Sequence, residues 1–162
     1  MYANIGLLLN AFLMGVMTSF IVVTSPTVFK TLDEEYSKKF LRFIFPRLFN
    51  FCFLISTAMF LFFALAEFSF GMVAGIVIAF GFLINTYLLT PRINKMRDLM
   101  ITGVTGSEKK FKMLHLASVL LYLISMVFIV AIFVFYYSRW VYFLNCKVKK
   151  IRRVVQKAVK HE

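Results

Sequence analysis

The sequence predicts an all-α integral membrane protein: a four-transmembrane-helix bundle with amphipathic connectors and a basic C-terminal tail. Hydrophobic residues make up 61% of the 162 residues and charged residues only 16%. A soluble domain has about 45–50% apolar and about 25% charged residues. Four apolar blocks fill most of the chain, each long enough for the about 20 residues that cross a bilayer. Nearly all of the charge lies between or after these blocks.

We expect one transmembrane domain at residues 1–138, followed by a basic amphipathic tail at residues 139–162. Within that domain the spans are expected at about residues 5–29, 48–66, 71–90 and 113–137. The first block is too long for a signal-peptide core and no basic segment precedes it, so it is interpreted as an uncleaved helix.

The segment after the first span predicts a short helix at the membrane surface. Thr31 and Glu34 fit a capping box, in which Thr31 would be the N-cap. Apolar residues then recur every four positions, at Leu32, Tyr36, Phe40 and Ile44. Phe45-Pro46 is expected to end this helix, because proline disfavours the α conformation of the residue before it.

The remaining elements follow from similar signals. A tight turn near Glu67 is expected to join the second and third spans, and Gly71, Gly75 and Ala79 form a small-xxx-small ridge for close helix packing. Pro91-Arg92 is expected to end the third helix before a polar connector. Ser107 is a plausible N-cap for the fourth helix.

The net charge of +12 points to membrane partners. We expect contact with the bilayer, with anionic lipid through the basic connectors and tail, and with a second copy or a membrane protein partner. No nucleic-acid module is visible. The two connectors carry eleven Lys/Arg and the tail carries eight, so the positive-inside rule gives conflicting orientations. Cytoplasmic connectors in a bacterial inner membrane are the expectation.

Polar residues inside the apolar blocks are the candidate site. His115 shares a helical face with Ser118, Tyr122 and Ser125. A polar face on a membrane helix is expected to point into the bundle. His115 would ligate a metal or haem or pass a proton; alternatively, it forms a hydrogen bond with a neighbouring helix.

Asn85 is expected to share a face with Arg92, seven residues later. Buried in lipid, its amide needs a partner, either another helix or a bound ligand. The Arg92 guanidinium would hold a carboxylate or phosphate, or else extend to lipid phosphate. Ser25 lies nearby, where Ser25-Pro26 marks a kink or helix end.

Sulfur ligands are the weaker candidates. Met14 and Met17 lie one turn apart, as a Cu(I) thioether pair would, but methionine in a membrane bundle also serves as flexible packing. The two cysteines, Cys52 and Cys146, form neither a disulfide framework nor a zinc motif.

Several short motifs together resemble a known family. They are Ser25-Pro26-Thr27-Val28-Phe29, Phe45-Pro46, Asn85, Pro91-Arg92, Met96 and Leu114-His115 with Ser118. Over about residues 5–137 they resemble domain of unknown function 4149, similar to transmembrane-protein-205-like proteins and grouped with the copper-resistance-D-like superfamily. The resemblance implies four membrane helices. For relatives it also implies copper handling or haem binding by membrane histidines, but only His115 lies near a span here.

The functional expectation is a small multi-pass membrane protein that binds or moves a metal ion, haem or small polar ligand within the bundle. The alternative is a non-catalytic structural or accessory subunit that binds a membrane partner or anionic lipid. No nucleophile–base–orienter set and no phosphate-binding glycine loop is visible, so no enzyme is expected. A haem-dependent oxidase is the least favoured class, because a second membrane histidine is missing.

Overall fold

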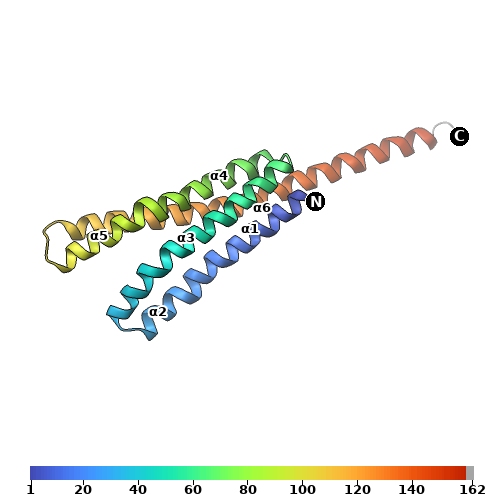
Figure 1. Ribbon diagram of the computed structural model, residues 1–162. Helices are drawn as coiled ribbons and strands as arrows, with labels where there is room; N and C mark the ends of the chain where they lie inside the picture. The colour runs from blue at the N-terminus through green and yellow to red at the C-terminus, as the bar shows by residue number, and fades with distance from the viewer. Residues whose placement is uncertain (160–162) are drawn as a thin grey trace.

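Four long helical segments run alongside one another in the computed structural model, which describes residues 1–159 (Figure 1). Short π-helical turns interrupt the first and third segments. In chain order the elements are α1 (Tyr2–Ser19), η1 (Phe20–Thr24), α2 (Ser25–Thr31), α3 (Glu34–Leu65), α4 (Ser69–Ile84), η2 (Asn85–Leu89), α5 (Thr90–Ile101) and α6 (Ser107–Val159).

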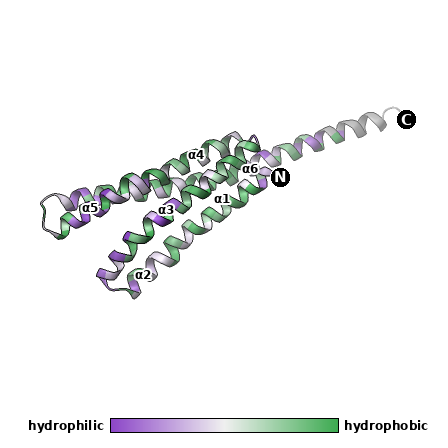
Figure 2. Ribbon diagram, in the orientation of Figure 1, coloured by the Kyte–Doolittle hydropathy of each residue, from purple (hydrophilic) through white to green (hydrophobic). Residues whose placement is uncertain are grey.

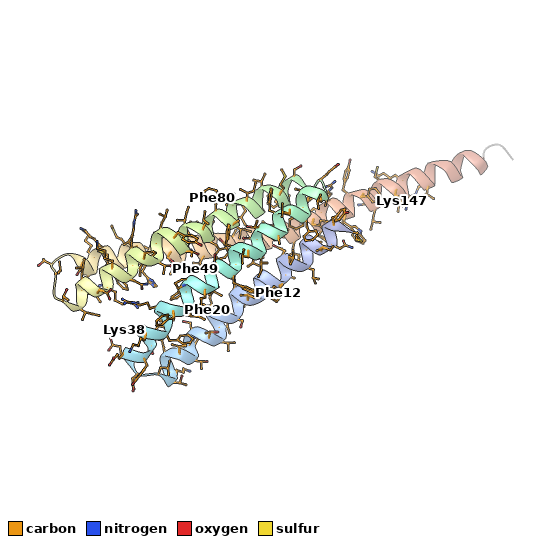
Figure 3. The ribbon with its side chains drawn as sticks, viewed as in Figure 1. Phe12, Phe20, Lys38, Phe49, Phe80 and Lys147 are labelled. Atoms are coloured by element: carbon orange, nitrogen blue, oxygen red, sulfur yellow. The ribbon has the colours of Figure 1, made fainter. Side chains whose placement is uncertain are left out.

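The four segments confirm the predicted all-α membrane bundle. Each is long and apolar enough to cross a bilayer: Tyr2–Thr31, Glu34–Leu65, Ser69–Ile101 and Ser107–Lys149. Polar residues gather at the ends of the helices, and apolar residues fill the length between them (Figure 2). Lys38 lies at the end where the connectors turn and Lys147 on the far extension of α6, with Phe12, Phe49 and Phe80 between them (Figure 3). The protein is therefore an integral membrane protein.

Pro46 does not end a helix, so the predicted separation of a surface helix from the second span is wrong. Pro46 lies inside α3, a single helix of 32 residues. Leu41 and Phe49, on either side of the proline, are both buried, and the Phe45 ring packs against Phe20 and Phe49. A common buried face on both sides of Pro46 outweighs the local cost of the proline.

The capping box predicted at Thr31 is also absent. Thr31 is the last residue of α2, and its hydroxyl donates to the carbonyl of Thr27 at 2.7 Å. Asp33 is the N-cap of α3 instead. The Ser37 hydroxyl lies 3.0 Å from the Leu32 carbonyl and 3.3 Å from the Val28 carbonyl, so it ties the start of α3 to the end of α2.

The first and third segments continue through their prolines in the same way, so the predicted helix end at Pro91 is wrong, and of the kink or helix end predicted at Pro26 the structure has no helix end. A π-turn precedes Ser25-Pro26, and another precedes Thr90-Pro91. Proline has no N–H and its ring clashes with the carbonyl four residues earlier. The amide before each proline bonds one residue further back: Ser25 N–H to the Phe20 carbonyl, and Thr90 N–H to the Asn85 carbonyl. Each helix continues beyond its proline, with its register shifted by one residue.

The turn between α3 and α4 confirms the predicted tight hairpin near Glu67. The Phe68 N–H donates to the Phe63 carbonyl and the Glu67 N–H to the Ala64 carbonyl, which is a Schellman motif. Glu67 occupies the left-handed position, with φ of 53°, that glycine usually takes. The Phe63 and Phe68 rings pack edge to face at 5.3 Å and close the motif.

Small residues let α4 lie close to α3, as the predicted ridge requires. Gly71, Gly75 and Ala79 are all buried. A Cβ placed on Gly75 would lie 3.1 Å from the Phe60 Cα. Side chains as small as hydrogen are therefore needed for this approach of the two backbones.

The fourth span and the tail form one helix. Ser107 begins α6, which agrees with the predicted start, and no break separates the span from residues 139–159. This part of α6 projects beyond the bundle on the side where the N-terminus lies (Figure 1).

Candidate ligand-binding pocket

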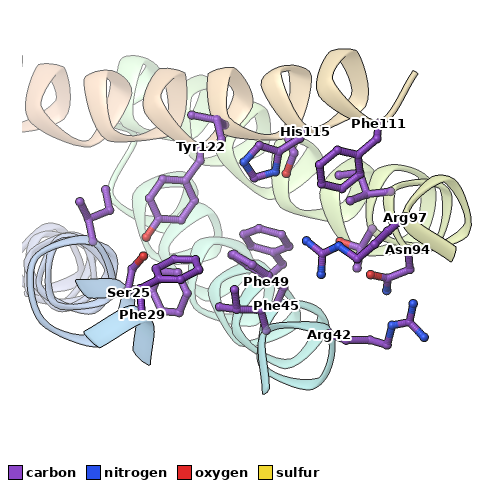
Figure 4. Close-up of a pocket in the computed structure, with 17 residues that line it drawn as sticks. Ser25, Phe29, Arg42, Phe45, Phe49, Asn94, Arg97, Phe111, His115 and Tyr122 are labelled. Carbon is purple, nitrogen blue, oxygen red and sulfur yellow. The ribbon is translucent and has the colours of Figure 1, made fainter. Parts of the chain in front are cut away.

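A pocket of about 350 Å³ lies at the end of the bundle where α2 meets α3 and α5 meets α6 (Figure 4). All four segments line it. Its apolar residues are Phe20, Ile21, Phe29, Leu41, Phe45, Phe49, Ile93, Phe111, Val119 and Tyr122. Its polar residues are Ser25, Arg42, Thr90, Asn94, Arg97, His115 and Ser118. Its volume falls within the about 300–1,000 Å³ of small-molecule sites, towards the lower limit.

Positive charge dominates the polar part of this pocket. Arg42 from α3 and Arg97 from α5 both line it, and none of the lining residues in the described chain is acidic. Asp98 pairs with Arg42 from outside the lining. One carboxylate thus faces two guanidinium groups, which leaves a net positive charge at the site.

Arg97, Phe111 and His115 form a stack along one wall. The Arg97 guanidinium carbon lies 5.2 Å from the centre of the Phe111 ring. That ring is parallel to the His115 imidazole, with centres 5.9 Å apart and planes at 4°. Phe111 thus contacts the cation through cation–π attraction and the imidazole through stacking. Both groups line the pocket and carry N–H donors.

The π-turns determine which side chains reach the pocket. A π-turn adds one residue, so the helix after η2 is rotated by about 100°, one residue of an α-helix. The face that contains Asn85 therefore continues through Ile93 and Arg97, which line the pocket, whereas Arg92 is exposed. The expectation that Asn85 and Arg92 share a face is wrong for this reason.

Asn85 lies behind the pocket and joins η2 to α6. Its side-chain Nδ2 donates to the Ser118 carbonyl at 3.3 Å, and the residue is 1% exposed. The Thr90 hydroxyl donates to the Asn85 carbonyl at 2.7 Å. The structure thus brings two of the predicted site residues, Asn85 and Ser118, together through a backbone carbonyl. The Asn85 Oδ1 atom is buried and has no partner within the described chain.

The predicted polar face of the fourth helix points into the bundle. Ser118, Tyr122 and Ser125 are buried, and the Tyr122 hydroxyl donates to the Met17 carbonyl at 2.9 Å. His115, nearer the helix start, is more exposed and lies at the margin of the pocket. Ser25 lines the pocket from α2, as the sequence analysis suggested.

The predicted metal ligands are not brought together. Met17 is fully buried in the core and Met14 packs against that core, and neither lines the pocket. No group of three His, Cys, Asp or Glu side chains suited to a metal occurs within the described residues. The donor set therefore does not fit a copper site of His115 with the two methionines.

A bis-histidine haem does not fit the pocket either. His115 is the one histidine among its lining residues in the described chain, and His161 lies outside the described residues. A haem placed here would have a single protein nitrogen as axial ligand.

Sequence reasoning missed Arg42, Asn94 and Arg97. Arg42 was assigned to a surface helix that ended at Pro46, and the other two to a polar connector. Nothing in the sequence indicated that the helices continue through Pro46 and Pro91. Because they do continue, these three polar side chains lie on elements that line a common pocket.

One family model matches the chain, with the description "Domain of unknown function (DUF4149)", over residues 8–102. No curated protein and no solved structure matches it. The matched region runs from α1 to the end of α5, so it includes Arg42 and Arg97 but not α6. Because the match covers more than half of the residues, the chain belongs to this family of unknown function.

Proposed function

We propose that this protein is a non-enzymatic membrane protein that binds a small ligand with a negatively charged group in the pocket. The supporting observation is the placement of Arg97 and His115, from two different segments, on one wall of a pocket that contains no acidic lining residue in the described chain. The lining provides N–H donors from two helices, which is what binding of an anion requires.

Electrostatics favour an anion over a neutral ligand. Charge in a site walled by phenylalanine is poorly screened, so an unpaired guanidinium there is costly. The carboxylate of Asp98 offsets the positive charge of Arg42. Among the described contacts, the Arg97 guanidinium has one cation–π partner, the face of the Phe111 ring. A carboxylate or phosphate would accept hydrogen bonds from Arg97 in bidentate geometry and offset this cost.

Of the ligand classes expected from the sequence, the anionic polar ligand is the best supported. The pocket offers hydrogen-bond donors and aromatic surface. Ser25 and Ser118 supply neutral hydroxyl groups to its lining. Arg92 lies outside the pocket and is exposed, so it is available to lipid phosphate.

The test is native mass spectrometry of the protein purified in mild detergent. We expect a bound species of constant mass in the parent protein, and its loss in Arg97→Gln. Arg92→Gln is the matched control, since it removes the same charge from the same helix outside the pocket. Equal occupancy in both variants would count against this site.

A structural or accessory role is the second candidate, and a pair of buried amides favours it. Asn10 Nδ2 donates to the Ile129 carbonyl at 3.0 Å, and Asn85 Nδ2 donates to the Ser118 carbonyl. Both fix other segments to α6. In this role the connectors and the extension of α6 would contact anionic lipid, a second copy or a membrane protein partner.

The proposed setting is a bacterial inner membrane, with the connectors on the cytoplasmic side. We also propose that the chain is related to transmembrane-protein-205-like proteins and to the copper-resistance-D-like superfamily. This relationship rests on the short motifs around Pro26, Pro91 and His115.

A further inference from the structure

We propose that the ligand is a single-chain amphiphile with an anionic head group, a carboxylate or a phosphate monoester, which enters the pocket sideways from the bilayer between α2 and α6. This inference rests on the proposed function and names its ligand class. It follows from the distribution of the lining residues, from the exposed edge of the pocket and from its volume.

The pocket has a strongly polar end, which carries both arginines, and a largely apolar end, where the hydroxyl groups of Ser25 and Tyr122 are the polar groups (Figure 4). Arg42, Asn94 and Arg97 lie together on one side, and Tyr122, Ser25 and Phe29 lie on the opposite side (Figure 4). Phenylalanines occupy the space between, and Phe49 is buried there among other aromatic rings. A ligand that contacts both ends needs a charged head and an apolar body.

The apolar end opens towards lipid. No Cα atom of α2 comes within 8 Å of a Cα atom of α6 or α5, although all three helices line the pocket. Phe29 on α2 and Val119 on α6 are 64% and 39% exposed, and in a membrane such surfaces face acyl chains. An apolar chain can therefore reach the pocket without crossing water.

The volume favours one chain. About 350 Å³ lies near the lower limit of ligand sites, which run from about 300 to 1,000 Å³. A head group and the first part of one chain fit such a space, with the rest of the chain in the bilayer. The two chains of a diacyl lipid would have to pass the same opening together.

A short water-soluble anion fits less well. Most of the lining is aromatic or aliphatic, and a small anion held at Arg97 would leave that surface without a partner. An acyl chain covers this surface, which removes it from water and adds packing contacts that a small anion cannot make. The charged end and the apolar end therefore both contribute to affinity, and the apolar end also sets which ligands can enter.

The experiment measures binding to the whole protein in nanodiscs of phosphatidylcholine. The probes are palmitate and 1-palmitoyl lysophosphatidate, with hexadecanol as the uncharged probe and acetate and inorganic phosphate as the probes without a chain. We expect saturable binding of palmitate, lysophosphatidate or both, and at least tenfold weaker binding of the other three. A preference between the two amphiphiles identifies the head group as a carboxylate or a phosphate.

Two matched pairs of variants test the two ends. Arg97→Gln should weaken binding of the anionic amphiphile about tenfold, and Arg92→Gln should leave it unchanged. Val119→Trp should narrow the opening and weaken amphiphile binding. Val127→Trp places the same bulk at a more exposed position of α6 outside the pocket and should have no such effect.

The outcomes separate this inference from the proposed function. If acetate or phosphate binds as tightly as the amphiphiles and needs Arg97, the anion site stands and the amphiphile is wrong. If hexadecanol binds as well as palmitate, the head-group assignment fails, and with it the role of the arginines. If no probe binds and Arg97→Gln retains the mass of the bound species in the purified protein, both proposals fail.

Discussion

Arg42 of α3 and Asp98 of α5 form an ion pair at the polar end of the pocket, although they lie 56 residues apart in the chain. The pair requires both α3 and the α4–α5 segment to continue through their prolines. Both side chains are partly exposed, at 39% and 56%, so the pair itself adds little stability, about 0.2–1 kcal/mol for such groups. We expect its effect on ligand binding to be larger, because Asp98 is the acidic partner of a pocket arginine.

Removing that carboxylate should strengthen ligand binding. In Asp98→Asn, Arg42 is released towards the pocket, and the affinity for an anionic probe such as palmitate should rise about three- to tenfold. The free energy of unfolding should change by less than about 1 kcal/mol. Glu108→Gln is the control, since Glu108 pairs with Lys112 on the exposed side of α6. Unchanged or weaker binding in Asp98→Asn would show that Arg42 does not contact the ligand.

The buried amides should contribute stability. Asn85→Ala removes the hydrogen bond to the Ser118 carbonyl and leaves a small cavity, so the free energy of unfolding should fall by about 1–2 kcal/mol. Asn10→Ala should behave similarly through the Ile129 carbonyl. Asn50 is exposed on α3, so Asn50→Ala is the control. Unfolding in mixed micelles measures all three, and no loss for either buried asparagine would refute their role in fixing α6.

Two glycines should respond in opposite directions to alanine. At Gly75 the new methyl group would lie 3.1 Å from the Phe60 Cα, so Gly75→Ala should push α3 and α4 apart and lower stability by about 1–3 kcal/mol. At Gly15 a Cβ meets nothing within 4 Å. Gly15→Ala should therefore be neutral or stabilise by up to about 1 kcal/mol. Equal effects in thermal unfolding would contradict the close packing at Gly75.

The left-handed residue in the α3–α4 turn offers a gain in stability. Glu67→Gly removes the Cβ from a backbone with φ of 53° and should stabilise the protein by about 1 kcal/mol. Glu67→Ala removes the charge but keeps the Cβ, so it should give little gain. A melting temperature that rises equally in both would assign the effect to the carboxylate and not to the backbone.

The four membrane segments were predictable because a bilayer imposes a simple requirement on length and hydropathy. The turn at Glu67 and the start of α6 at Ser107 were also found. The boundaries at the prolines were not, because proline disfavours a helix locally whereas packing continues the helix through it. At Pro46 a continuous buried face, from Leu41 to Phe49, decides the outcome, and that face exists only once α1 and α3 have packed.

The candidate site was predictable in part. His115 and Ser118 reach the pocket because they share the predicted polar face of α6, and Ser25 lines it from α2. Arg97 could not be found, since counting seven residues from Asn85 selects Arg92 in a regular helix. The extra residue of η2 shifts the helical register, so that Ile93 and Arg97 lie on the same face as Asn85. A π-turn is not clearly indicated by amino-acid composition. In this chain a Ser or Thr before a proline accompanies both turns, at Ser25-Pro26 and Thr90-Pro91.

The most direct test of the central claim compares Arg97→Gln with Arg92→Gln in the binding of palmitate and 1-palmitoyl lysophosphatidate to the whole protein in phosphatidylcholine nanodiscs. An anion-binding pocket predicts about tenfold weaker binding for Arg97→Gln and parent-like binding for Arg92→Gln. Parent-like binding in Arg97→Gln, with a loss in Arg92→Gln, would place the ligand at the lipid-facing arginine and contradict the pocket as the site.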